Sequence, residues 1–383
     1  MKRAAALAWD GDNMASSLGR LRGAGLPQSA LPAEDRGRHG AIRLWLAVVI
    51  VLVLAMIVVG GATRLTDSGL SITEWQPILG AIPPLSDADW HAAFEKYKEI
   101  PEYHQINKGM SLDAFKVIFW WEWAHRFLGR FIGLIFALPL VIFWLMGKVP
   151  QGYGGRLLGV LALGGLQGVI GWYMVKSGLV DRIDVSHYRL ALHLSTALLI
   201  LAALTWLWLD LGPRDEGIHL ATLRRGHVSG AWVIAILIAL QVVLGAFVAG
   251  LKAGLTYNTW PLMDGQLIPN GLVTLQPWYV NFLENVTTVQ FSHRAVAYLL
   301  LVVAIWHSIS IARTADDGRV VRSGWLVSGL LLAQACLGIA ILITAFGAIP
   351  LSLGLAHQLG GALIVMGIVL HLHRLSSARA GQV

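Results

Sequence analysis

The sequence predicts an all-α polytopic membrane protein whose eight transmembrane helices form two pseudo-symmetric four-helix bundles. Three observations predict this fold: the composition, the number of long apolar runs, and an internal repeat. Of the 383 residues, 56% are hydrophobic and only 13% are charged, which is typical of a membrane protein rather than a soluble domain. The single cysteine, Cys336, excludes an intrachain disulfide and a cysteine-based metal motif. The formal charge of +7 is scattered among loops, which argues against nucleic-acid binding.

Eight apolar runs are long enough to cross a bilayer, because a spanning helix needs about 20 residues. The runs lie at about 42–63, 117–146, 157–176, 190–211, 229–251, 287–312, 325–346 and 353–373. An even number of crossings places both termini on the same side. Arginine and lysine concentrate before the first run, in alternate loops and after the last run, so the positive-inside rule predicts that both termini are cytoplasmic.

These runs divide the chain into two predicted bundles and their connections. The N-terminal 40 residues are rich in glycine, alanine and arginine and contain no apolar core, which favours a disordered tail over a cleavable signal peptide. The predicted segments are a cytoplasmic tail (1–40), a first bundle (41–211) with a long outer loop (64–116), a cytoplasmic linker (212–228), a second bundle (229–373) and a cytoplasmic tail (374–383).

The long outer loop contains signals for helices of its own. Ser86 precedes two aspartates, as the N-cap of a helix does. Trp90, Phe94 and Tyr97 then fall on one helical stripe, which predicts an interfacial helix over the ends of the spans. Ser111 is a second N-cap candidate and predicts a helix that runs directly into the second span.

The second half of the chain repeats the first. The matching segments are 60–77 with 245–261, 122–126 with 290–294, 166–171 with 333–338, and 192–194 with 356–358. Four spans per half with the same orientation predict two bundles related by an axis along the membrane normal. Each bundle then carries one histidine on its second helix and one on its fourth, and bundles build cofactor sites from facing helices in this way.

The repeated histidines are His125 and His193 in the first half and His293 and His357 in the second. A lone histidine in a span is often an interhelical hydrogen-bonding residue, but two matching pairs favour metal ligation. Imidazole binds iron, copper, zinc and nickel alike, so histidine alone does not identify the metal. A closed zinc site needs four protein ligands, whereas axial ligation of a heme needs only two.

One polar position breaks the repeat: Glu122 stands where the second half has Gln290. A desolvated carboxylate beside one histidine pair could act as a general base or orient a water, which predicts that the first bundle performs chemistry and the second carries electrons. The alternative is a simple ion pair with Arg126, four residues along the helix. Arg64, Arg126 and Arg294 are candidate contacts for heme propionates; Glu122 or lipid phosphate are the alternative partners for the last two.

Five stretches resemble heme A synthase: 60–71, 74–77, 122–126, 291–294 and 356–358. The resemblance covers essentially all of the chain between the two predicted tails. The outer loops contain no cysteine, which resembles the branch of that family found in alphaproteobacteria and mitochondria.

The resemblance implies oxidation of the C8 methyl group of heme O to the formyl group of heme A, for terminal oxidase assembly. It implies a heme b cofactor on His293 and His357, and substrate heme O near His125 and His193 with Glu122 as catalytic acid or base. It further implies a bacterial inner membrane with the heme sites toward the outer side, and a heme O synthase and oxidase assembly factors as partners. Association into a homo-oligomer stays open.

The main alternative is a diheme b-type membrane cytochrome that carries electrons only. Such a protein needs the four histidines but gives no reason for the difference between Glu122 and Gln290. A transporter or heme exporter is a second alternative, but the broken helices typical of transporters are not evident in the sequence.

Overall fold

The computed structural model describes residues 39–76, 79–181, 184–212 and 225–380. In these residues the regular structure is helical, apart from one isolated bridge between Met263 and Gln266. Eight of the helices are long and apolar enough to cross a membrane, which confirms the predicted class and the number of spans. They are α2 (Gly40–Leu65), α5 (Leu112–Leu145), α6 (Gly154–Asp181), α7 (His187–Asp210), α8 (Arg225–Gly250), α10 (Val286–Thr314), α11 (Gly318–Thr344) and α12 (Leu351–Ala380).

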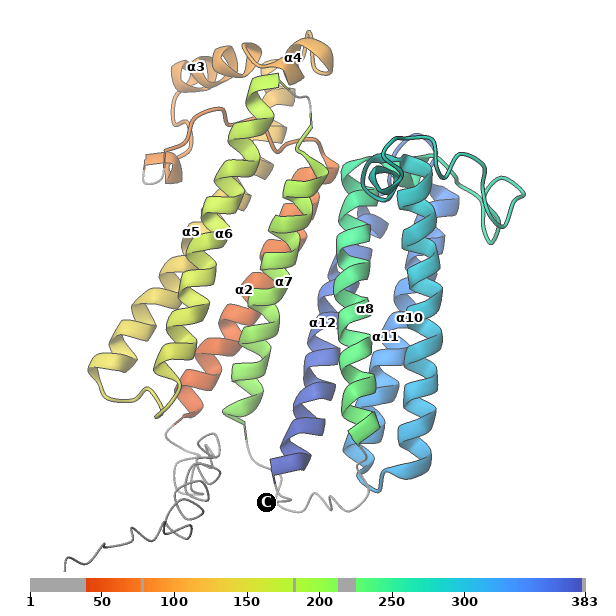
Figure 1. The fold of residues 1–383 in the computed structure, drawn as a ribbon. Coiled ribbons are helices and arrows are strands. Elements are labelled where there is room, and N and C mark those ends of the chain that lie inside the picture. The colour runs from red at the N-terminus through yellow and green to blue at the C-terminus, as the bar shows by residue number, and fades with distance from the viewer. Residues whose placement is uncertain (1–38, 77–78, 182–183, 213–224, 381–383) are drawn as a thin grey trace, which may run out of the picture.

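The eight long helices lie side by side, and the two longest connections cover the same end of the molecule (Figure 1). We call this the loop-covered end, formed by residues 66–111 and 251–285. The first connection contains α3 (Asp87–Lys98) and α4 (Pro101–Gln105), and the second contains α9 (Asn281–Glu284). Short 3₁₀ helices complete them: η2 (Leu79–Ala81), η3 (Ala253–Leu255) and η4 (Trp278–Val280).

The four helices of each half contact one another in the same cyclic order. In the first half α2 contacts α5, α5 contacts α6, α6 contacts α7, and α7 contacts α2; in the second half α8, α10, α11 and α12 do the same. The halves meet through α2, α7, α8 and α12. One apolar core lies mainly in the first half and includes Leu46, Leu201 and Leu204, and the other lies mainly in the second and includes Ile234 and Ile311. A symmetry axis between the halves stays a prediction.

The helix predicted in the long outer loop is present as α3. Ser86 caps it through a capping box, in which its Oγ accepts a hydrogen bond from Asp89 N while the Asp89 side chain accepts one from Ser86 N. Trp90, Phe94 and Tyr97 are buried, as the helical stripe predicted. They pack on the start of α5 and hold α3 over the end of the first half.

Helix α5 begins at Leu112, several residues before the apolar run that revealed it. Ser111 Oγ accepts a hydrogen bond from Ala114 N at 3.2 Å and caps the helix, as predicted. Pro139 lies inside α5 and has no N–H to offer to the carbonyl of Ile135, four residues earlier. Trp45 of α2 donates its indole N–H to that carbonyl at 2.8 Å, so the broken helical bond becomes a contact between helices.

Two of the predicted segments fall mainly outside the described residues: the N-terminal tail (1–40) and the linker (212–228). The last residues of a third, the C-terminal tail (374–383), also lie outside them. Within the last of these, α12 continues to Ala380. The division of the chain into functional segments therefore stays a prediction.

Candidate functional site

Four helices each place one histidine against a glycine of the neighbouring helix. A Cβ atom added at that glycine would lie 2.9 Å from His125 Nε2 (Gly60), 3.0 Å from His193 Cε1 (Gly171), 3.1 Å from His293 Cε1 (Gly245) and 3.2 Å from His357 Cε1 (Gly338). Such distances leave no room for a larger residue without displacing the ring. Each imidazole therefore lies on bare helix backbone, and all four repeated histidines share this arrangement.

Three of the four histidines also receive a hydrogen bond on their backbone carbonyl from a glutamine of the neighbouring helix. Gln167 Nε2 donates to His193 O at 3.0 Å, Gln241 Nε2 to His293 O at 3.1 Å, and Gln334 Nε2 to His357 O at 2.8 Å. Each glutamine precedes the packing glycine by four residues. The repeated Gln-x-x-x-Gly is a signal in the sequence from which these glutamines could have been found. At the corresponding position of α2 the residue is Met56.

The rings of the first histidine pair lie close together in the structure. The ring centres of His125 and His193 are 6.5 Å apart. Two imidazole nitrogens about 2 Å from one metal on opposite sides would place the ring centres roughly 6 Å apart. In addition, Nδ1 of His193, His293 and His357 is buried and has no protein partner. Buried polar atoms without partners are rare, so these rings fit a site completed by a bound group.

The donor set fits heme better than a bare metal ion. Among the described residues, no cluster of three or more histidine, cysteine, aspartate or glutamate side chains could hold a metal. A closed zinc site is therefore not supported, since it needs four protein ligands. Two imidazoles per half would be enough to hold the iron of a heme, and the glycines let each ring lie close to the neighbouring helix.

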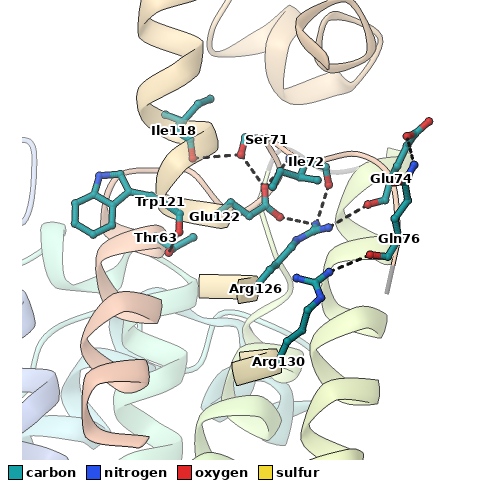
Figure 2. A network of polar contacts seen from close by, with 10 residues as sticks. All are labelled: Thr63, Ser71, Ile72, Glu74, Gln76, Ile118, Trp121, Glu122, Arg126 and Arg130. Carbon is teal, nitrogen blue, oxygen red and sulfur yellow. Dashed lines mark hydrogen bonds and ion pairs between the residues drawn. The ribbon is translucent and has the colours of Figure 1, made fainter. Parts of the chain in front are cut away.

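Glu122 lies one turn before His125 in α5 and is 2% exposed. Its Oε2 accepts hydrogen bonds from Ser71 Oγ at 2.8 Å and from Ile72 N at 2.6 Å, and its Oε1 accepts one from Arg126 Nη2 at 2.6 Å (Figure 2). The ion pair with Arg126, which the sequence offered as the alternative to a catalytic role, is therefore present, and a catalytic role for Glu122 stays a prediction. Three donors, one of them the Arg126 guanidinium, therefore fix the position of this buried carboxyl group.

Arg126 also fastens the first outer loop to α5. Its guanidinium group donates to Ile72 O at 2.8 Å and to Glu74 O at 3.1 Å. One turn further, Arg130 donates to Gln76 O at 3.0 Å, so two arginines of one helix hold successive carbonyls of the loop (Figure 2). The loop lies against Glu122 because of these contacts.

The second half has the same arginine contacts to its loop, but the residue that corresponds to Glu122 acts as a hydrogen-bond donor. Arg294 Nη2 donates to Thr259 O at 3.1 Å and to Pro261 O at 3.0 Å, as Arg126 does to its own loop. Gln290 is 3% exposed and donates through Nε2 to Tyr257 O at 3.0 Å. Where Glu122 accepts a backbone N–H, Gln290 therefore donates to a backbone carbonyl.

The three candidate propionate contacts all bind backbone carbonyls in the structure. Arg64, at the end of α2, donates to the carbonyl of Ala249 in α8 and so links the two halves. Nη1 of Arg294 is buried and has no partner, which leaves a donor for a carboxylate. Their contact with propionates stays a prediction.

The histidines outside the repeat form contacts of their own. His307 Nε2 and His371 Nε2 are 3.0 Å apart in the second core, and Ser323 Oγ lies 2.8 Å from His371 Nδ1. Both histidines are buried. These contacts give His307 and His371 a packing role in the second core.

Comparison with known proteins identifies the family of this chain. Residues 43–369 match the model of a family described as cytochrome oxidase assembly protein. The chain belongs to this family. Its helices, repeated histidines and buried glutamate are therefore those of a cytochrome oxidase assembly protein that is integral to a membrane.

Three relatives within this family illustrate the extent of the similarity. The heme A synthase of Rhizobium meliloti is 52% identical over 88% of this chain and 89% of its own length. That of Agrobacterium fabrum is 51% identical over 89% and 91%, respectively. That of Parvibaculum lavamentivorans is 50% identical over 92% of this chain and 99% of its own. The similarity therefore covers most of this chain and most of each of the three relatives.

Proposed function

We propose that this protein is a heme A synthase, which oxidises the C8 methyl group of heme O to the formyl group of heme A for oxidase assembly. The relatives carry that name over nearly the full length of the chain. The observation that carries the proposal is the buried Glu122, which pairs with Arg126 one turn from His125, while the matching position in the second half is Gln290.

In this proposal the two histidine pairs have different occupants. His293 and His357 hold heme b as a resident cofactor, and His125 and His193 receive heme O as substrate. The fit of both pairs rests on the packing glycines and on ring nitrogens that lack protein partners. The bound hemes supply the oxidising chemistry, which protein side chains cannot provide.

The protein contributes orientation and proton transfer. Glu122 is on the same helix as His125 and one turn away, so its carboxylate lies beside the substrate site. Its ionised form can accept a proton released from the methyl carbon or orient a water molecule. Ser71, Ile72 and Arg126 fix the position of that carboxylate.

The proposed orientation places the loop-covered end on the outer side of a bacterial inner membrane, with both termini in the cytoplasm. Loops at the opposite end carry the excess of arginine and lysine, as the positive-inside rule requires of a cytoplasmic face. The four repeated histidines then lie toward the outer side. Heme O would come from the membrane enzyme that prenylates heme, and heme A would pass to oxidase assembly factors.

The test is the heme content of a bacterial host that makes heme O but has lost its own heme A synthase. Expression of this chain should produce heme A in extracted membranes, while the empty vector should leave only hemes B and O. Membranes that contain the expressed protein with bound heme b but no heme A would contradict the proposal. That outcome would favour the cytochrome that carries electrons only.

A further inference from the structure

One hydrogen bond joins the two halves directly beside both histidine pairs. Gln358 of α12 donates through Nε2 to the carbonyl of Ile57 in α2 at 2.6 Å, across 301 positions of sequence. A helix carbonyl has a second lone pair, so it can accept this bond in addition to its helical one. Gln358 directly follows His357, the candidate ligand in the second half.

The partner segment of α2 lies against the first histidine site. A Cβ added at Gly61 would lie 2.5 Å from Gln358 Oε1, and one added at Gly60 would lie 2.9 Å from His125 Nε2. Two successive glycines thus contact Gln358 and His125, respectively. A single turn of α2 therefore contacts both Gln358, the residue after His357, and the ring of His125.

At the corresponding positions of the repeat, the residues are apolar. Gln358 corresponds to Leu194, which follows His193, and Gly61 corresponds to Ala246, which follows Gly245. Leu194 and Ala246 lie in one apolar cluster. An apolar pair therefore suffices to pack helices at this position, whereas burying an amide is unfavourable unless it is hydrogen-bonded. Packing alone does not explain the pair of Gln358 and Gly61.

We propose that Gln358 is a positioning residue that fixes the separation between the substrate site in the first half and the heme b site in the second. This inference rests on the proposed function. Gln358 acts through α2: its bond to Ile57 sets the distance between the backbone that supports His125 and the backbone that carries His357. A displacement of about 1 Å at a reacting centre can lower a rate on the order of a hundredfold.

The experiment compares three variants of the full-length protein in membranes and after purification. Gln358→Leu removes the hydrogen bond. Gln358→Leu combined with Gly61→Ala recreates the apolar pair found in the other half. Gln358→Met removes the bond with an unbranched side chain that adapts to its surroundings. The readouts are bound heme b, the rate of heme O conversion, and the magnetic interaction between the two ferric hemes in electron paramagnetic resonance, which depends on their separation.

The expected result is unchanged heme b content, conversion reduced about ten- to a hundredfold, and an altered interaction between the hemes in all three variants. Wild-type conversion and an unchanged magnetic interaction in the double variant would overturn the proposal, because apolar packing would then suffice. Loss of activity only in proportion to loss of heme b, in Gln358→Met as well, would also overturn it. A wild-type protein that binds two hemes but makes no heme A refutes the proposed function, and the magnetic measurement still decides the role of Gln358.

Discussion

The centres of the two halves share a frame and differ in one functional group. In both, a histidine lies on a glycine, and an arginine one residue further along the helix holds carbonyls of the covering loop. Glu122 accepts a backbone N–H in the first half, while Gln290 donates to a backbone carbonyl in the second. In the proposed function, the residues that hold a heme in both halves are therefore separate from Glu122, the residue that reacts in only one of them.

A second difference concerns how firmly the histidine backbones are held. Gln241 donates to the carbonyl of His293, but the corresponding residue beside His125 is Met56. The first half also has a helical cover of α3 and α4, whereas the second connection contains only α9 and short 3₁₀ turns among its described residues. The half that carries Glu122 therefore differs in its support and its cover as well as in its central residue.

The largest expected effect separates the ligand histidines from the other buried histidines. His293→Ala removes one of the two histidines proposed to hold heme b and should abolish the b-type absorbance of the purified protein. His307→Ala is the matched control on the same helix, because His307 bonds to His371 rather than to a bound group. Retained absorbance in His293→Ala, or equal loss in both variants, would contradict the assignment of the second pair to heme b.

The next effect tests the unequal roles of the two arginines. Arg126→Ala leaves the buried Glu122 without its cation, and breaking such a pair destabilises a protein by about 3–5 kcal/mol. Arg294→Ala removes two bonds to backbone carbonyls and leaves no carboxylate behind, so a loss of about 1–2 kcal/mol is expected. Thermal unfolding in detergent should give the lower Tm for Arg126→Ala. Equal values would show that Glu122 does not depend on Arg126 for its charge.

A smaller, pH-dependent effect tests the cover of the first half. Glu102 of α4 is 4% exposed and accepts a hydrogen bond from the Tyr97 hydroxyl at 2.9 Å. Burial, with smaller contributions from Glu122, Asp67 and Asp184, raises the pKa of Glu102 from 4.5 to about 7. Because the folded state binds this proton more tightly than the unfolded state, stability falls as the pH rises from about 4.5 to 7.

Replacement of Glu102 by glutamine removes that dependence. The free energy of unfolding of Glu102→Gln minus that of wild type should therefore be larger at pH 8 than at pH 5, by on the order of 2 kcal/mol. Unfolding curves at the two pH values measure the difference. A stability difference that is the same at both would show that Glu102 is ionised in the folded protein throughout this range.

The sequence was sufficient for features that depend on hydropathy and local spacing. Eight spans follow from the bilayer's demand for apolar length, and the caps at Ser86 and Ser111 follow from local hydrogen bonding. The repeat identified the four histidines and the difference at Glu122. The sequence could not predict the hydrogen bonds from Trp45 to Ile135 and from Gln358 to Ile57. In both, the acceptor is a backbone carbonyl, which every residue has, so the partner's residue type carries no signal.

Heme extraction from Glu122→Gln tests most directly the proposal that Glu122 takes part in the oxidation of heme O while the histidines hold the hemes. The variant should be purified beside wild type from cells that make heme O, and the hemes resolved as b, o, the hydroxylated intermediate and a. We expect Glu122→Gln to keep heme b and to accumulate heme O, with heme A lowered about a hundredfold or more. Heme A at the wild-type level in that variant would contradict the proposal.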